Sequence, residues 1–129
     1  MVVRCVLNEG YLFSPRKVRQ GLTQKTTYNE ITIHREYNVH GILFYEDGLR
    51  YLLFDDCETP YWYPADLFVV IDNKVPEQWY YKFFGYEETV SAIWGYYELV
   101  HSEEHFDGLS EQETKAIDLF LKRKKEIYN

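Results

Sequence analysis

The sequence predicts an α+β fold, in which residues 1–72 form a small antiparallel β-barrel and residues 73–129 add two or three packed helices. Two observations predict this division. Short alternating apolar segments, separated by turn residues, follow one another through the first range, which is typical of small closed all-β structures. Apolar residues at helical spacing and a helix-capping sequence mark the second range. With 129 residues, both parts fit within one cooperative unit that shares a core.

The first three strands are predicted from β-branched and alternating residues. Residues 2–7 are rich in valine and form the opening strand. Residues 11–29 are polar and are expected to form a long loop. Residues 31–37 and 39–45 then alternate between apolar and polar side chains, which predicts two further strands.

A hairpin and a second turn organise the middle of the barrel. Residues 46–48 read Glu-Asp-Gly, which predicts a tight hairpin because Gly adopts a positive φ without steric cost and Asp tolerates one. Residues 49–54 return as a strand, and residues 55–59 form the next turn. The acids near this turn suit acid–base chemistry or cation binding, but acids in turns commonly accept backbone hydrogen bonds, and we favour that role. These acids are Asp55, Asp56, Glu58 and Asp66.

Residues 61–70 are the most informative segment of the chain. They read Tyr-Trp-Tyr-Pro-Ala-Asp-Leu-Phe-Val-Val. An aromatic strand meets residues 64–67, which are too few for an α-helix and suit one 3₁₀ turn, and residues 69–71 then close the sheet. Because side chains alternate across a strand, one set of rings should enter the core, and the other should face solvent or lie beneath the C-terminal helices.

Residues 61–70 resemble the last turn and strand of SH3 domains, where an aromatic-Pro-small-polar-apolar sequence forms the 3₁₀ turn. Residues 1–72 are also similar to SH3-like barrel segments of uncharacterised bacterial and phage proteins, in which an acidic pair, here Asp55 and Asp56, ends a strand. This resemblance implies an SH3-like five-stranded barrel. Of the residues with which SH3 domains bind proline-rich peptides, only Pro64 carries over, so the resemblance concerns the fold and not that activity.

The second range is predicted to be helical. Residues 76–81 start with Pro and can begin a short helix, and the apolar residues of 87–100 recur at helical spacing around Gly95. Residues 110–113 read Ser-Glu-Gln-Glu, a capping box that starts the last helix. One stripe of that helix, whose apolar members should pack on the barrel or on the helix of residues 87–100, comprises Ala116, Ile117, Phe120, Leu121, Lys124 and Ile127.

The composition excludes several classes of protein. The formal net charge is −7, which argues against nonspecific nucleic-acid binding because that binding needs a positive surface. No stretch reaches the roughly 18 apolar residues of a membrane span, and the start of the chain lacks a signal-peptide pattern. Cys5 and Cys57 show no metal-binding or redox spacing. We therefore expect a cytoplasmic protein with reduced thiols, no membrane association and no cofactor.

One short motif could carry metal chemistry. Residues 101–105 match the H-x-x-E-H pattern of inverzincins, in which two histidines bind zinc and the glutamate activates a water. His101, Glu104 and His105 would take these roles. That chemistry needs both histidines on one helical face, whereas Ser102 resembles a helix cap that would leave His101 outside the helix. We favour solvated or capping histidines.

The function predicted from these features is that of a small acidic, non-enzymatic protein-binding module. The aromatic content of 19% supplies residues that suit interfaces, and the segment from Glu87 to Asp118 is strongly acidic. Such compact acidic chains are similar to bacterial immunity proteins and phage-encoded inhibitors, which act by steric occlusion of a basic target. The predicted surface comprises Tyr61, Trp62, Tyr63, Trp79, Glu87, Glu88, Glu98, Glu103, Glu104 and Asp107.

Two alternatives remain open at this point. The first is a small metal-binding protein or hydrolase centred on the motif of residues 101–105. The second is a structural module that self-associates through Trp62 or through the aromatic residues of 79–84. The competing interpretation of the 79–84 aromatics, which we favour, is that they attach the helical part to the barrel.

Overall fold

The computed structural model describes residues 1–9, 26–46 and 48–128, and its described part is a mixed α+β fold, which confirms the predicted class. The strands form two antiparallel sheets, with the orders β2-β1-β6 and β5-β4-β3-β8-β7. The strands are β1 (Val2–Cys5), β2 (Glu36–Asn38), β3 (Gly41–Tyr45), β4 (Gly48–Phe54), β5 (Pro60–Pro64), β6 (Phe68–Asp72), β7 (Tyr80–Phe83) and β8 (Val90–Gly95). The helices are the 3₁₀ turn η1 (Ala65–Leu67) and the α-helices α2 (Tyr97–His101), α3 (Glu103–Ser110) and α4 (Thr114–Tyr128).

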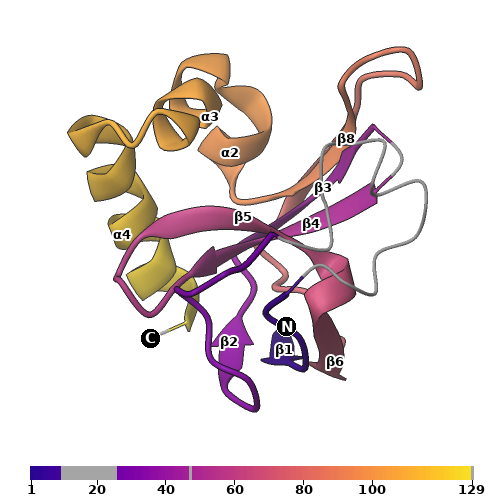
Figure 1. The fold of residues 1–129 in the computed structure, drawn as a ribbon. Helices are drawn as coiled ribbons and strands as arrows, with labels where there is room; N and C mark the ends of the chain where they lie inside the picture. The colour runs from indigo at the N-terminus through magenta and orange to yellow at the C-terminus, as the bar shows by residue number, and fades with distance from the viewer. Residues whose placement is uncertain (10–25, 47, 129) are drawn as a thin grey trace.

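The five-stranded sheet is the middle layer of the molecule. Figure 1 shows α2, α3 and α4 gathered on one side of β3, β4 and β5, and β1, β2 and β6 on the other side. Strand β4 packs against both of these layers. Tyr51 and Leu53 belong to the core shared with β1 and β6, whereas Leu52 belongs to the core under the helices. A strand that is covered on both faces is apolar at successive positions, and all three of these residues are buried.

The barrel expected over residues 1–72 differs from the structure. The described strands lie in two open sheets, and β3 pairs along its whole length with β8, which lies beyond residue 72. Strand β7 then pairs with β8, so residues 80–95 extend the sheet of the first range. The expectation that residues 73–129 are wholly helical is therefore wrong for this segment.

The helix expected over residues 87–100 is instead strand β8 followed by the short helix α2. Ser91, Ala92 and Ile93 are consecutive residues of β8, which lies between β3 and β7, and all three are buried, so both faces of the strand are covered there. A fully buried strand of this length cannot be distinguished from a helix by apolar spacing alone. The short helix expected at 76–81 is also wrong, since β7 begins at Tyr80.

The start of the last helix is displaced from the predicted capping box. Ser110 ends α3, and α4 begins at Thr114. Between them Gln112 has a φ of +57°, its N–H donates to the Leu109 carbonyl, and the Glu113 N–H donates to the Gly108 carbonyl. This pair of bonds is a Schellman motif, so these residues terminate a helix before the next one starts.

The early part of the chain also departs from expectation. Most of the predicted loop 11–29 lies outside the described residues. The strand expected over 31–37 is reduced to β2, because residues 32–35 form a turn in which His34 has a φ of +76° and the Arg35 N–H donates to the Thr32 carbonyl. The other predicted strands and the 3₁₀ turn are confirmed within a few residues. No helix of the described residues is long and apolar enough to cross a membrane.

Candidate functional site

A groove with a volume of about 520 Å³ opens between the β7–β8 hairpin and helices α2 and α3. Buried side chains form part of its lining, namely Ile93 of β8 with Leu99 and Val100 of α2. Val90 and Phe106 extend this apolar lining. The volume and the apolar lining are suited to receiving a few apolar side chains of a ligand or partner.

Two glycines determine how closely α2 approaches the sheet. Gly41 of β3 and Gly95 of β8 are register partners, and a Cβ built on either would lie 2.5 Å from Leu99 Cδ2. Real Cβ atoms do not come so close to a buried neighbour, so any larger residue would displace Leu99. The pair of glycines therefore lets Leu99 pack directly on the sheet, where it forms part of the groove lining.

Three of the predicted acids line this groove, namely Glu88, Glu103 and Asp107. All three are exposed, and none takes part in an ion pair within the described part of the chain. Lys82 lines the groove as well, and its Nζ lies 5.1 Å from the ring centroid of Phe84, another lining residue. The groove thus combines an apolar interior with exposed carboxylates, and it already places an ammonium group over one of its rings.

The other predicted acids do not belong to the groove. Both oxygens of Glu98 accept bonds from Arg123, each 2.8 Å long, and these bonds lower the pKa of that carboxyl. Glu104 lies 3.6 Å from Lys115 and lines a smaller cavity of about 340 Å³. Glu87 is exposed and does not line the groove. The sequence could not separate Glu98 from the groove acids, because its pairing with Arg123 depends on a contact between α2 and α4.

The predicted aromatic surface is also divided between different environments. Tyr63 is buried in the core shared with β1, and Trp62 packs on the opposite face of β5, with its ring centroid 6.1 Å from that of Phe106. Trp79 is partly buried against the same core as Tyr63, whereas Tyr61 is 52% exposed. Alternation across the strand is confirmed, and Trp62 is covered by α3 rather than free to anchor a partner.

A ring cluster beside the groove was not identified from the sequence. Tyr80 of β7 lies 5.3 Å from Tyr97 and 5.6 Å from His101, and the last two rings are 4.9 Å apart, measured between centroids. His101 lines the groove. A strand over residues 80–84 would have placed Tyr80, Lys82 and Phe84 on one face, because side chains alternate along a strand. This cluster was missed because a helix was expected over residues 76–81.

The two histidines of the H-x-x-E-H pattern lie on different helices. His101 ends α2 and is exposed, whereas His105 lies on α3, is buried, and places Nε2 2.6 Å from the Tyr96 hydroxyl. Burial lowers the pKa of His105 and raises the pKa of Tyr96. Ser102 caps α3 as expected, since its Oγ accepts the His105 N–H at 3.1 Å. Among residues 1–9, 26–46 and 48–128, no group of three or more His, Cys, Asp or Glu is placed to hold a metal ion.

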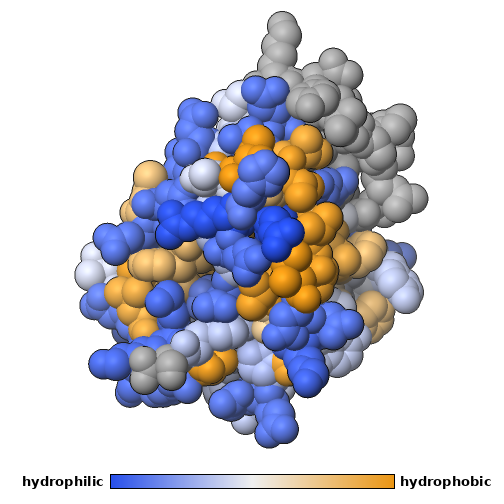
Figure 2. Space-filling model, turned by 90° about the horizontal axis from the view of Figure 1, so that it is seen from below, coloured by the Kyte–Doolittle hydropathy of each residue, from blue (hydrophilic) through white to orange (hydrophobic). Residues whose placement is uncertain are grey.

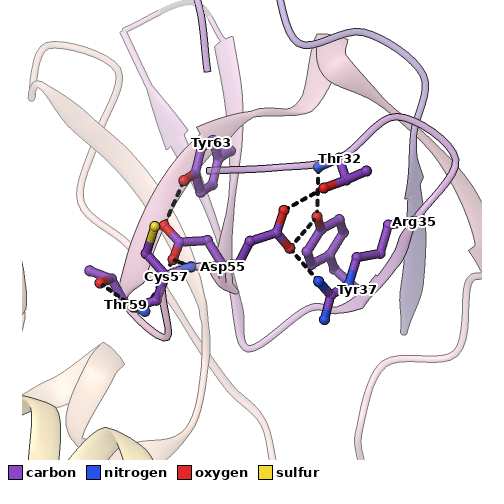
Figure 3. A network of polar contacts seen from close by, with 8 residues as sticks. Thr32, Arg35, Tyr37, Asp55, Cys57, Thr59 and Tyr63 are labelled. Atoms are coloured by element: carbon purple, nitrogen blue, oxygen red, sulfur yellow. Dashed lines mark hydrogen bonds and ion pairs between the residues drawn. The ribbon is translucent and has the colours of Figure 1, made fainter. Parts of the chain in front are cut away.

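Two of the acids at the β4–β5 turn, Asp55 and Asp56, accept hydrogen bonds from other residues of the chain (Figure 3). Asp55 Oδ1 accepts the N–H groups of Cys57 and Thr59, at 3.0 and 3.1 Å, and Oδ2 accepts the buried Tyr63 hydroxyl at 2.7 Å. This confirms the expected turn role of Asp55.

The neighbouring Asp56 joins the turn to residues 32–37. One carboxylate oxygen accepts the Thr32 hydroxyl at 2.6 Å, and the other accepts Arg35 at 2.7 Å and the Tyr37 hydroxyl at 2.9 Å. The Tyr37 hydroxyl accepts the Thr32 N–H in turn, at 2.9 Å. Both aspartates therefore have a structural role.

No protein-family model matches the chain, and no curated protein and no solved structure matches it. A functional assignment therefore depends on the geometry of the described residues. Of the features described above, the groove is the one that joins an apolar interior to exposed carboxylates without an ion-pair partner among the described residues.

Proposed function

We propose that the protein is a small acidic, non-enzymatic protein-binding module, and that the groove receives a segment of a partner with apolar and basic side chains. The observation that carries this proposal is the apolar groove lined by the exposed carboxylates of Glu88, Glu103 and Asp107, which form no ion pair in the described part of the chain. Apolar side chains of the partner would fill the interior, and its basic side chains would meet the carboxylates.

The charge of the chain supports a basic partner. The net charge of −7 and the acidic groove would raise the rate of encounter with a positive surface, an effect that salt screens over a Debye length of about 8 Å at physiological ionic strength. Exposed charges act more on the association rate and on specificity than on the affinity itself. The apolar lining would then provide most of the binding free energy.

The class of protein proposed is an inhibitor or immunity-type protein of bacteria or phage that acts in the cytoplasm by steric occlusion. Its support is an analogy with compact acidic proteins that cover a basic functional surface of their targets. The resemblance of residues 1–72 to bacterial and phage barrel segments supports the same source.

We also propose that strands β1 to β6 are arranged as in SH3 domains. The 3₁₀ turn η1 separates β5 from β6, as the resemblance of residues 61–70 implies, and β6 pairs antiparallel with β1. Strands β2 and β3 are separated by only Val39 and His40, and this short link leads the chain from one sheet to the other.

The test compares two variants with the same change in charge. The groove variant carries Glu88→Gln, Glu103→Gln and Asp107→Asn. The control variant carries Glu30→Gln, Glu77→Gln and Asp118→Asn, which are exposed acids outside the groove.

Wild type and both variants are immobilised and exposed to a lysate of the native organism, and the retained proteins are identified. We expect a basic protein that wild type and the control variant retain and the groove variant loses. Equal retention by the two variants would refute the groove as the binding site, and retention of no basic protein by wild type would refute the proposed function.

A further inference from the structure

The two open sheets end in four edge strands, β2, β5, β6 and β7, and three of them carry features that discourage pairing with another chain. Strand β2 has three residues and includes Glu36, β5 begins and ends with Pro60 and Pro64, and β7 has Lys82 in its interior. Short length, proline and charge are among the usual protections of an edge strand, and a β-bulge is another. Strand β6 has no proline and no charged residue before Asp72, and its one register irregularity lies at its end, just before Asp72.

Strand β6 also exposes three consecutive apolar residues. Val69, Val70 and Ile71 are each 45% exposed. Strand β6 pairs with β1 on one side only, and its register against β1 is regular from Phe68 to Val70 and shifts between Val70 and Asp72, beside Ile71. Figure 2 views the molecule from the side on which β1, β2 and β6 lie in Figure 1, and it shows apolar side chains gathered in one area beside hydrophilic ones.

We propose that β6 packs against β6 of a second copy of this chain across a two-fold axis. With Val70 at the axis and the strands antiparallel, Val69 would face Ile71 of the second copy and Phe68 would face its Asp72. This arrangement places valine and isoleucine together at the centre and keeps the two Asp72 carboxylates apart. The proposal concerns a different surface from the groove and does not depend on the proposed function.

The charges beside β6 favour a second copy over a partner of one charge sign. Arg4 is the register neighbour of Val69 and forms a 2.9 Å ion pair with Glu36, and Asp72 is followed by Lys74. A border that contains both signs does not repel a second copy in the way that a border of one sign would. The acidic groove would repel a second copy, because two copies would bring like charges together.

The exposed apolar patch is small, and a stable interface needs about 800 Å² from each partner. We therefore expect a weak dimer that forms as the protein concentration rises from the low to the high micromolar range. Because the chain carries a net charge of −7, added salt should strengthen the dimer by screening the repulsion between copies.

Sedimentation equilibrium over this concentration range tests the proposal, with wild type, Val70→Lys and the control Leu121→Lys. Leu121 lies on α4, is 39% exposed, and gives the same change in charge outside β6. The milder variant Val69→Thr covers the case in which Val70→Lys does not fold, which far-ultraviolet circular dichroism reports.

We expect the weight-average mass of wild type and Leu121→Lys to rise towards that of a dimer as the concentration increases. The β6 variants should stay monomeric, or should reach the same mass only at a protein concentration at least tenfold higher. A wild-type mass that stays monomeric throughout, or folded β6 variants that associate like wild type, would overturn the proposal. A further variant, Tyr81→Lys, changes an exposed residue of the edge strand β7. Loss of the dimer in this variant, with the β6 variants associating like wild type, would also overturn the proposal and would place the contact on β7.

Discussion

Two groups of acidic residues in this chain differ in what their carboxylates contact. At the β4–β5 turn, Asp55 and Asp56 accept six hydrogen bonds from the chain itself. At the groove, Glu88, Glu103 and Asp107 are exposed and have no ion-pair partner among the described residues. Carboxylates thus form hydrogen bonds within the fold in one place and are exposed to solvent in the other. The comparison predicts that removing the carboxylate of Asp55 lowers the stability of the fold, whereas neutralising the groove acids leaves the stability almost unchanged.

The largest effect on stability is expected from Asp55→Ala. This change leaves the Tyr63 hydroxyl and two turn amides without their acceptor, and hydrogen bonds to a charged group contribute about 1.5–3 kcal/mol each. Since some of these donors will reach water, we expect a loss of about 3 kcal/mol in the free energy of unfolding, measured with urea. The exposed control Glu77→Ala should change it by less than about 0.5 kcal/mol. A loss for Asp55→Ala no larger than that of the control would contradict the structural role of Asp55.

The second prediction concerns a buried base. The pKa of His40 is lowered to about 3, mainly by burial and in addition by the nearby positive charges of Lys124 and the N-terminus. In the unfolded chain His40 titrates near its usual pKa of 6.5, so the unfolded state binds the proton first as the pH falls. His40 therefore costs no stability above pH 6.5 and destabilises the fold progressively between pH 6.5 and about 3.

Urea unfolding at a series of pH values measures this effect. In wild type, His40 should add a slope of up to about 1.4 kcal/mol per pH unit below pH 6.5. The variant His40→Leu should lose this contribution, whereas His101→Gln, which changes an exposed histidine, should keep it. Identical pH profiles for His40→Leu and wild type would show that His40 is not the buried base responsible.

A smaller effect is expected from Tyr37→Phe. The Tyr37 hydroxyl donates to Asp56 and accepts the Thr32 N–H, and burial raises the pKa of Tyr37 to about 12. Loss of one hydroxyl in a network that keeps its other donors should cost about 1 kcal/mol of unfolding free energy. The matched change Tyr86→Phe, at a tyrosine that is 88% exposed, should have no measurable effect. A similar cost for both changes would mean that the network does not stabilise the turn.

The smallest effect on stability is expected from the groove variant with Glu88→Gln, Glu103→Gln and Asp107→Asn. These side chains are exposed, so their neutralisation should change the free energy of unfolding by less than about 0.5 kcal/mol. A small gain is equally compatible, because the chain carries excess negative charge. A loss above about 1 kcal/mol would assign these acids to the fold and remove the contrast with Asp55 and Asp56.

The sequence predicted local features better than long-range ones. The turn after residue 54, the 3₁₀ turn at Pro64 and the cap at Ser102 each depend on residues close in sequence, and all are confirmed. Strand β8 was predicted as a helix because its burial depends on pairing with β3, almost fifty residues earlier in the chain. The capping box at Ser110 failed because Gln112 adopts a positive φ and closes the preceding helix.

The candidate site was only partly predictable from the sequence, because it too depends on contacts between residues far apart in the chain. An acidic surface was expected, but three of its six acids do not line the groove, and one of these, Glu98, is paired with Arg123 of α4. The groove itself arises where β7 and β8 meet α2 and α3, which no single segment of the sequence reveals. The exposed strand β6 was recognised as a strand, but its position at a sheet edge depends on its pairing with β1.

The most direct test of the central claim is the association rate of the captured basic partner, measured by stopped-flow at increasing salt concentration. For wild type and the control variant with Glu30→Gln, Glu77→Gln and Asp118→Asn, the rate should start high and fall steeply with salt. For the groove variant it should start lower and depend much less on salt, because the steering carboxylates are gone. A rate that is independent of salt in wild type, or equal in the two variants at every salt concentration, would contradict the proposed acidic groove.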